Sequence, residues 1–182
     1  MTTVDHTHPD NLEKYAFFWS EVRLVIAAFS LIIGGFPVAY KLFGFVPFFA
    51  RPVNTLLTIA WVISGVSAGY LLYRWNKEGR TVFGGKSRND LIAFFFLVIT
   101  GINLGVAGLL GVNLGMKFSL GGNLYAIVGV LYLAVAYYLH KRYKESGGKV
   151  FVGTAKSGEL NNGSDVTTIS EEKPKEETKQ NE

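Results

Sequence analysis

"LIAFFFLVITGINLGVAGLLGVNLGM", residues 91–116, is the stretch that decides the fold, because it contains no Asp, Glu, Lys, Arg or His. Three further stretches also lack these residues, at 24–40, 55–73 and 123–139. A helix rises about 1.5 Å per residue, so roughly 17 to 25 residues cross the hydrocarbon core of a bilayer. No stretch shows the polar face at period 3.6 of a soluble helix. We therefore predict an all-α membrane protein, a four-helix transmembrane bundle with spans at about 22–42, 54–75, 91–114 and 123–141.

The ends of the chain differ in composition from this central part, which we predict to be a four-span transmembrane domain over residues 12–149. Residues 1–11 are predicted to be flexible. Beyond about Lys149 the chain carries few apolar residues and many charges of both signs, so it cannot bury enough surface to offset its conformational entropy. Residues 150–182 are therefore predicted to form a disordered cytoplasmic tail. The chain has no cysteine, and His6 and His8 lack further ligands nearby, so neither a metal nor a cofactor is predicted.

Basic residues flank the spans unevenly, and this asymmetry predicts the orientation. Lys and Arg near span ends are retained on the cytoplasmic side. With four spans, the loop between the second and third and the segment after the fourth lie on one face, so both termini are predicted to be cytoplasmic. The compact loops favour a prokaryotic plasma membrane. The positive charge suits lipid headgroups and requires no nucleic acid. The residues expected to contact headgroups are Arg74, Lys77, Arg80, Lys86, Arg88, Lys141 and Arg142.

Glycines of the third span predict close contact with another helix. At 100° per residue, Gly101, Gly105, Gly108 and Gly115 point within about 40° of one direction and leave a groove. Small residues let helix backbones approach each other within lipid. The second span offers a counterpart in Ser64, Gly65 and Gly69. A dinucleotide-binding loop is excluded, because its glycines follow a strand and open a helix, whereas these lie within a span.

Ionisable residues inside a membrane usually mark proton relays, ion paths or catalysis, and we expect none inside these spans. Glu21 and Arg23 are placed at the mouth of the first span, after a short surface helix. Two residues apart on a helix, they do not face each other. We interpret them as anchors at headgroup level, with a gating or substrate carboxylate at Glu21 as the alternative. Asn103 is expected to form a hydrogen bond with another helix, or else to contact a substrate.

The preferred functional hypothesis is a non-enzymatic scaffold or accessory subunit, whose glycine faces dock helices within a homo-oligomer or with a membrane-protein partner. The alternative is a small transporter or channel for a neutral or lipid-like solute, with Asn103, Ser64 and Ser67 lining its path. A membrane enzyme using Glu21 or His140 is a third hypothesis, disfavoured by the lack of titratable groups at depth. A cavity lined by the three polar side chains would favour transport, and a bundle sealed by glycine contacts would favour a scaffold.

Overall fold

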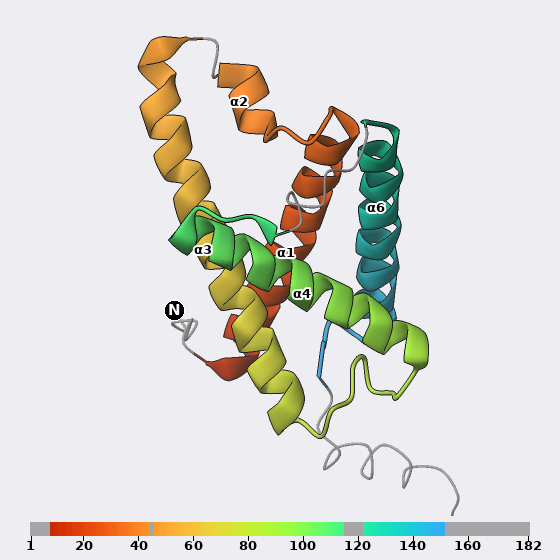
Figure 1. Ribbon diagram of the computed structural model, residues 1–182. Helices are drawn as coiled ribbons and strands as arrows, with labels where there is room; N and C mark the ends of the chain where they lie inside the picture. The colour runs from red at the N-terminus through yellow and green to blue at the C-terminus, as the bar shows by residue number, and fades with distance from the viewer. Residues whose placement is uncertain (1–7, 44–45, 115–121, 152–182) are drawn as a thin grey trace, which may run out of the picture.

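Four long helices and one short helix make up the described part of the chain, residues 8–43, 46–114 and 122–151 of the computed structural model (Figure 1). Four of them, all but α2, are long and apolar enough to cross a membrane. In Figure 1, α1 and α6 run side by side in opposite directions, and α4 crosses α3. The prediction of an all-α four-helix transmembrane bundle is confirmed. The helices are α1 (Pro9–Ile32), α2 (Val38–Phe43), α3 (Pro47–Lys77), α4 (Arg88–Leu110) and α6 (Gly122–Glu145).

The first helix begins much earlier than the span predicted at residues 22–42. Pro9 stands in the first turn of α1, where its missing N–H is no loss, and the His8 Nδ1 atom accepts a hydrogen bond from the backbone N–H of Asp10 at 3.4 Å. Residues 9–11 are therefore helical rather than flexible, and the expected separate surface helix is the first part of α1. As a consequence, Arg23 lies inside a membrane-spanning helix and not at its mouth.

Glycines end two of the helices before the predicted span boundaries. The α1 helix ends at Ile32 rather than near residue 42, because Gly34 and Gly35 follow with φ angles of 101° and 83°. The α4 helix ends at Leu110 rather than near residue 114, because Gly111 takes a left-handed conformation with φ of 68°. Glycine adopts this conformation without the steric cost that a Cβ atom imposes.

The closest helix contact is made by the glycines of α4 against α3. A Cβ atom built on Gly105 would lie 2.6 Å from the Cα of Gly65, and the reverse also holds. A Cβ on Gly101 would lie 2.6 Å from the Cβ of Ala68. A Cβ on Gly108 would lie 3.0 Å from the backbone nitrogen of Val62, a tight contact that small shifts of its neighbours would have to relieve. Real Cβ atoms essentially never come within 3.0 Å of other atoms, so Gly101 and Gly105 require glycine if the two backbones are to pack as they do.

Not every residue of the predicted packing set takes part in this contact. Ser64 does, since its carbonyl oxygen lies 3.2 Å from a Cβ built on Gly101. Gly69 does not, because nothing lies within 4 Å of its Cβ position. The line of contact on α3 passes through Ala68, and the next residue points about 100° away from it. Gly115 lies outside the described residues.

A further glycine joins the other helix pair, and the sequence did not predict it. A Cβ atom on Gly129 of α6 would lie 2.8 Å from the carbonyl oxygen of Ala28 and 2.7 Å from a side-chain carbon of Ile32, both on α1. The bundle therefore consists of two close helix pairs, α3 with α4 and α1 with α6, and each pair has glycine at its contact.

An apolar cap covers the end of the bundle where α3 and α6 finish. It contains Val82 and Phe83 from the loop before α4, and Val150 and Phe151 after α6, all less than a tenth exposed. The Phe83 N–H donates to the Val150 carbonyl oxygen at 2.7 Å. Residues 150 and 151 were assigned to a disordered tail, and this boundary is wrong, because they bury their side chains against Phe94 and other core residues. The rest of the predicted tail lies outside the described residues.

We predict that Val150→Ala destabilises the protein although its position was assigned to the tail. Val150 is 1% exposed. Its truncation removes two buried methyl groups, a loss of about 1.5 kcal/mol at about 0.8 kcal/mol for each group. Thermal unfolding in detergent micelles measures the change. Lys149→Ala, an exposed neighbour, should change stability by less than about 0.5 kcal/mol, and equal effects of the two substitutions would show that the cap contributes no stability.

Two ion pairs tie the helices together beside this cap. On one side, Arg74 Nη2 of α3 lies 2.9 Å from Glu13 Oε2 of α1. On the other, Arg142 Nε of α6 lies 2.8 Å from Asp90 Oδ1 of α4. Arg74 and Arg142 were expected to contact headgroups, but they bind carboxylates within the fold instead. The other basic residues of that set are exposed, namely Lys77, Arg80, Lys86, Arg88 and Lys141.

Candidate functional site

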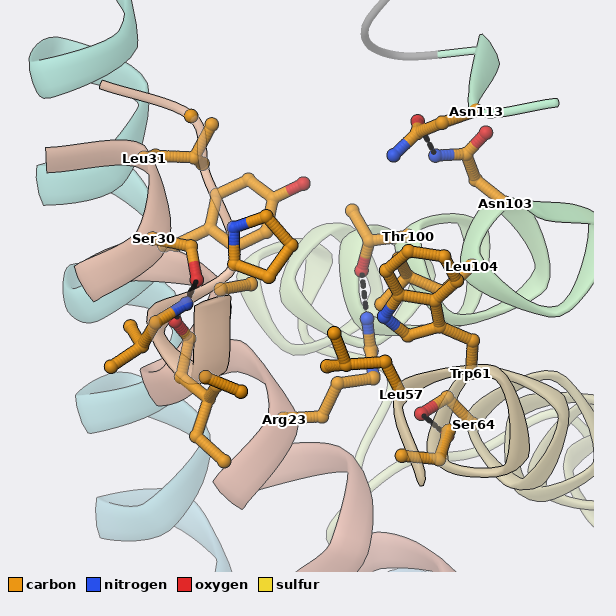
Figure 2. A pocket seen from close by; sticks show the side chains of 18 of the residues that line it. Arg23, Ser30, Leu31, Leu57, Trp61, Ser64, Thr100, Asn103, Leu104 and Asn113 are labelled. Carbon is orange, nitrogen blue, oxygen red and sulfur yellow. Dashed lines mark hydrogen bonds between the residues drawn. The ribbon is translucent and has the colours of Figure 1, made fainter. Parts of the chain in front are cut away.

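A cavity of about 410 Å³ lies between α1, α3, α4 and α6 (Figure 2). Most of its lining is apolar or aromatic, with side chains such as Ile26, Leu57, Trp61, Leu104 and Tyr132. A few polar side chains interrupt this wall, namely Arg23, Ser30, Ser64, Thr100, Asn103 and Asn113. Its volume falls at the lower end of the range of about 300 to 1,000 Å³ for small-molecule sites, which are also mostly apolar with a few polar groups. The cavity therefore has the size and the lining of a site for one small solute.

Among the described residues that line this cavity, Arg23 has the only charged side chain. In Figure 2 it reaches from α1 towards Thr100 on α4, and its Nη1 donates to the Thr100 hydroxyl oxygen at 3.2 Å. Its Nη2 donates to the Leu97 carbonyl oxygen at 2.8 Å. The residue is 6% exposed, and its Nε has no hydrogen-bond partner. Two acceptors of α4 thus hold the guanidinium group in place without saturating its donors.

The guanidinium group lies deep within the helices. Arg23 comes fourteen residues after Pro9 and nine before Ile32, which correspond to about 21 and 14 Å along α1. The hydrocarbon core of a bilayer is about 30 Å thick, so this position is far from both ends of a helix that is long and apolar enough to cross it. The expectation that no ionisable residue occurs inside a span is therefore wrong. A charge at such a depth is costly and usually marks a functional site.

No carboxylate among the described residues neutralises Arg23. Glu21 is its nearest acid in the sequence, but it points to α6, where its Oε2 lies 3.5 Å from His140 Nδ1. Glu13 is engaged by Arg74. Side chains two positions apart on a helix differ by about 200° in direction, which explains why Glu21 and Arg23 face different helices. Within the described part of the chain, the positive charge at the cavity has hydrogen-bond acceptors but no counter-ion.

Glu21 and His140, the two residues named for a possible enzyme, come together between α1 and α6. Glu21 is 8% exposed, and its Oε1 has no hydrogen-bond partner. Neither residue lines the cavity. An acid and an imidazole at 3.5 Å can exchange a proton, but the pair lies apart from the cavity, so the two features do not form one site.

The three residues predicted to line a solute path have different surroundings. Asn103 and Ser64 line the cavity, whereas Ser67 is buried elsewhere on α3. Asn103 was expected to bond another helix. Instead its Nδ2 donates to the Asn113 side-chain oxygen at 2.9 Å, and its oxygen accepts the Leu114 N–H at 3.0 Å, so it holds the turn that follows α4. The turn at Gly111 brings these residues back to the helix.

Several lining residues were not assigned to a site from the sequence, above all Arg23 and Trp19. The Trp19 Nε1 donates to the Ser64 hydroxyl oxygen at 3.1 Å and so links α1 to α3. The helical spacing of the apolar residues before Trp19 could have indicated that α1 begins before the predicted span. If that segment is joined to the apolar stretch that follows, one helix results with Arg23 near its centre.

Four apolar helices with a large exposed apolar surface define the chain as a multi-pass membrane protein. The exposed side chains lie on the outside of all four long helices, for example Phe18, Val66, Ile99 and Ile127, each more than 60% exposed. Surfaces of this kind face lipid rather than water. Comparisons of the chain with protein-family models, curated proteins and solved structures found no match.

Proposed function

We propose that the protein is a small transporter that takes a lipid-like solute into the cavity between its membrane-spanning helices. The observation that carries the proposal is the position of the cavity, which lies among all four long helices, opens on one side, and is lined by residues of each helix and of the α1–α2 connection. An apolar lining with a few polar groups fits an amphipathic molecule better than an ion or a sugar. The α1–α2 connection, including Gly35 and Pro37, forms part of the lining and offers a place for the cavity to open.

The scaffold hypothesis relied on glycine faces that would dock a partner. In the described residues, the glycines of α4 pack against α3 and Gly129 of α6 packs against α1. These glycines form contacts between helices of the same chain, so their presence does not indicate that a partner protein docks on them. A cavity has no evident purpose in a scaffold, whereas a transporter requires one. We therefore prefer the transporter.

We further propose that the capped end of the bundle faces the cytoplasm. The exposed basic residues Lys77, Arg80, Lys86 and Arg88 lie in or beside the loop between α3 and α4, and Lys141 lies near the end of α6. Positive residues in short loops are retained on the cytoplasmic side. In this orientation the α1–α2 connection faces the opposite side.

A cysteine at the cavity tests the proposal, and the chain contains no other. Ala60 lines the cavity from α3. We expect a membrane-impermeant thiol reagent to label the Ala60→Cys variant in vesicles of both orientations, because a transporter opens its site to each side in turn. Addition of 1-dodecanol at about ten times its dissociation constant should slow labelling about tenfold, because only about one site in eleven then stays free.

Lys86→Cys is the matched control, since this side chain is exposed in the loop before α4 and away from the cavity. Its labelling should occur from one side only and should be unaffected by the alcohol. Labelling of the Ala60→Cys variant from neither side would contradict a transporter. Labelling that the alcohol leaves unchanged would show that the cavity is not a site for lipid-like solutes.

A further inference from the structure

The charge at the cavity points to the chemical class of the solute. Arg23 has five N–H groups, of which two donate to Thr100 and Leu97. The others have no partner among the described residues, and the buried Nε is one of them. Hydrogen bonds to neutral oxygens hold the group in position but leave its charge uncompensated, which is expensive within an apolar bundle.

We infer that the solute is a single-chain amphipathic anion whose oxyanion headgroup binds Arg23 while its chain fills the apolar part of the cavity. This inference rests on the proposed function, because it requires that the cavity is the solute site. The planar guanidinium fork matches the geometry of a carboxylate or phosphate, and charge-assisted bonds of this kind are about twice as strong as neutral ones. Bound anion and guanidinium neutralise each other at a depth where neither is stable alone.

The lining supports the assignment of the two ends of the solute. Near Arg23, Thr100 and Tyr132 line the cavity and add polar character around a headgroup. Elsewhere the wall is built from apolar side chains such as Ile26, Leu57 and Leu104. A volume of about 410 Å³ suits one alkyl chain. A diacyl lipid fits less well, because its two chains would need about twice the space that one chain fills.

The tryptophans provide a binding signal without any label on the protein. Trp19 and Trp61 line the cavity, whereas Trp75 is packed against Phe94 and Phe95 near the cap. Bromine on an alkyl chain quenches nearby tryptophan fluorescence. The full chain in lipid nanodiscs is titrated with 12-bromododecanoate and with 12-bromododecanol, at a pH well above the pKa of a carboxylic acid and with concentrations expressed per lipid.

We expect saturable quenching by both probes, with the carboxylate binding about ten- to hundredfold more tightly, as for one charge-assisted hydrogen-bonded pair. Arg23→Gln should abolish this difference, and Arg23→Lys should retain part of it. Arg51→Gln, a matched change at an exposed arginine outside the cavity, should leave the difference intact. If Arg23→Gln fails to fold, the comparison of the two probes on the unaltered protein still decides the question.

The outcomes separate this inference from the proposed function. Equal binding of the two probes, or tighter binding of the alcohol, would overturn the anionic headgroup and leave the lipid-like solute standing. If quenching by both probes rises linearly without saturation, the probes only partition into lipid. This result would overturn the proposal that the cavity is a solute site. A third titration with 12-bromododecyl phosphate shows whether the headgroup is a phosphate or a carboxylate. Tighter binding than the carboxylate supports a phosphate, weaker binding supports a fatty acid, and both keep the oxyanion assignment.

Discussion

Replacing Gly105 with leucine is expected to prevent α3 and α4 from packing, and to leave little folded protein after extraction into detergent. Even a methyl group at this position would lie 2.6 Å from the Cα of Gly65, which is backbone and cannot rotate away. Leucine adds three more carbon atoms in the same place. Both helices would have to separate, and the contacts of Gly101 and Gly108 on the same face would be lost with them.

Milder substitutions give this prediction a measurable scale. Gly105→Ala should cost about 1 to 3 kcal/mol, the usual range for overpacking a close contact. Gly69→Ala is its control, because this glycine of α3 is also within a membrane-spanning helix, yet nothing lies within 4 Å of its Cβ position. Alanine favours helix over glycine, so Gly69→Ala should leave stability unchanged or slightly increased. Thermal unfolding in detergent and elution on size exclusion measure both variants. Equal stability of Gly105→Ala and Gly69→Ala would contradict the close approach of α3 and α4.

The glycine pattern shows which part of the fold could be predicted from the sequence. The spacing of Gly101, Gly105 and Gly108 places them on one face of a helix by local geometry alone, and this face does meet α3. The extent of the contact depends on how the two helices cross, which no local pattern contains. Gly69 was therefore included in the packing set although it faces outward.

Arg23 shows why the site could not be predicted in the same way. Spans were delimited by the absence of charge, so a charged residue inside a helix was necessarily read as a boundary. What allows Arg23 to lie deep in the bundle is the Leu97 carbonyl group and the Thr100 hydroxyl group, more than seventy residues away in the sequence. Their position follows only from the packing of α1 against α4.

The cap illustrates the same limit at the other end of the bundle. Its residues come from two separate segments, and the loop residues Val82 and Phe83 lie among glycines and charges that suggest an exposed turn. Basic residues near the ends of spans suggest headgroup contacts, because counting charges does not reveal their partners. Arg74 and Arg142 instead find Glu13 and Asp90, which lie at least 52 positions away along the chain. Such pairs belong to the tertiary structure.

Asp90→Asn is expected to destabilise the protein by about 3 kcal/mol, at the lower end of the range for breaking a buried ion pair. The Asp90 side chain is fully buried, and three donors point at its two oxygens. Arg142 Nε and the Tyr138 hydroxyl group donate to Oδ1 at 2.8 Å, and Arg142 Nη2 donates to Oδ2 at 2.8 Å. Asparagine has the same shape but only one oxygen, so its amide nitrogen must face at least one of these donors, and the charge of Arg142 loses its buried partner.

Glu145→Gln is the matched change, from carboxylate to amide, at the other acid that binds Arg142. Glu145 is exposed, and its Oε2 accepts from Arg142 Nη1 at 2.8 Å. Water can replace this bond, so the substitution should cost less than about 1 kcal/mol. Unfolding of both variants in mixed micelles measures the difference, and combining each with Arg142→Gln gives the coupling energy. If Asp90→Asn costs no more than Glu145→Gln, the buried pair does not hold α4 to α6, and the stability of this end must come from the aromatic packing of the cap.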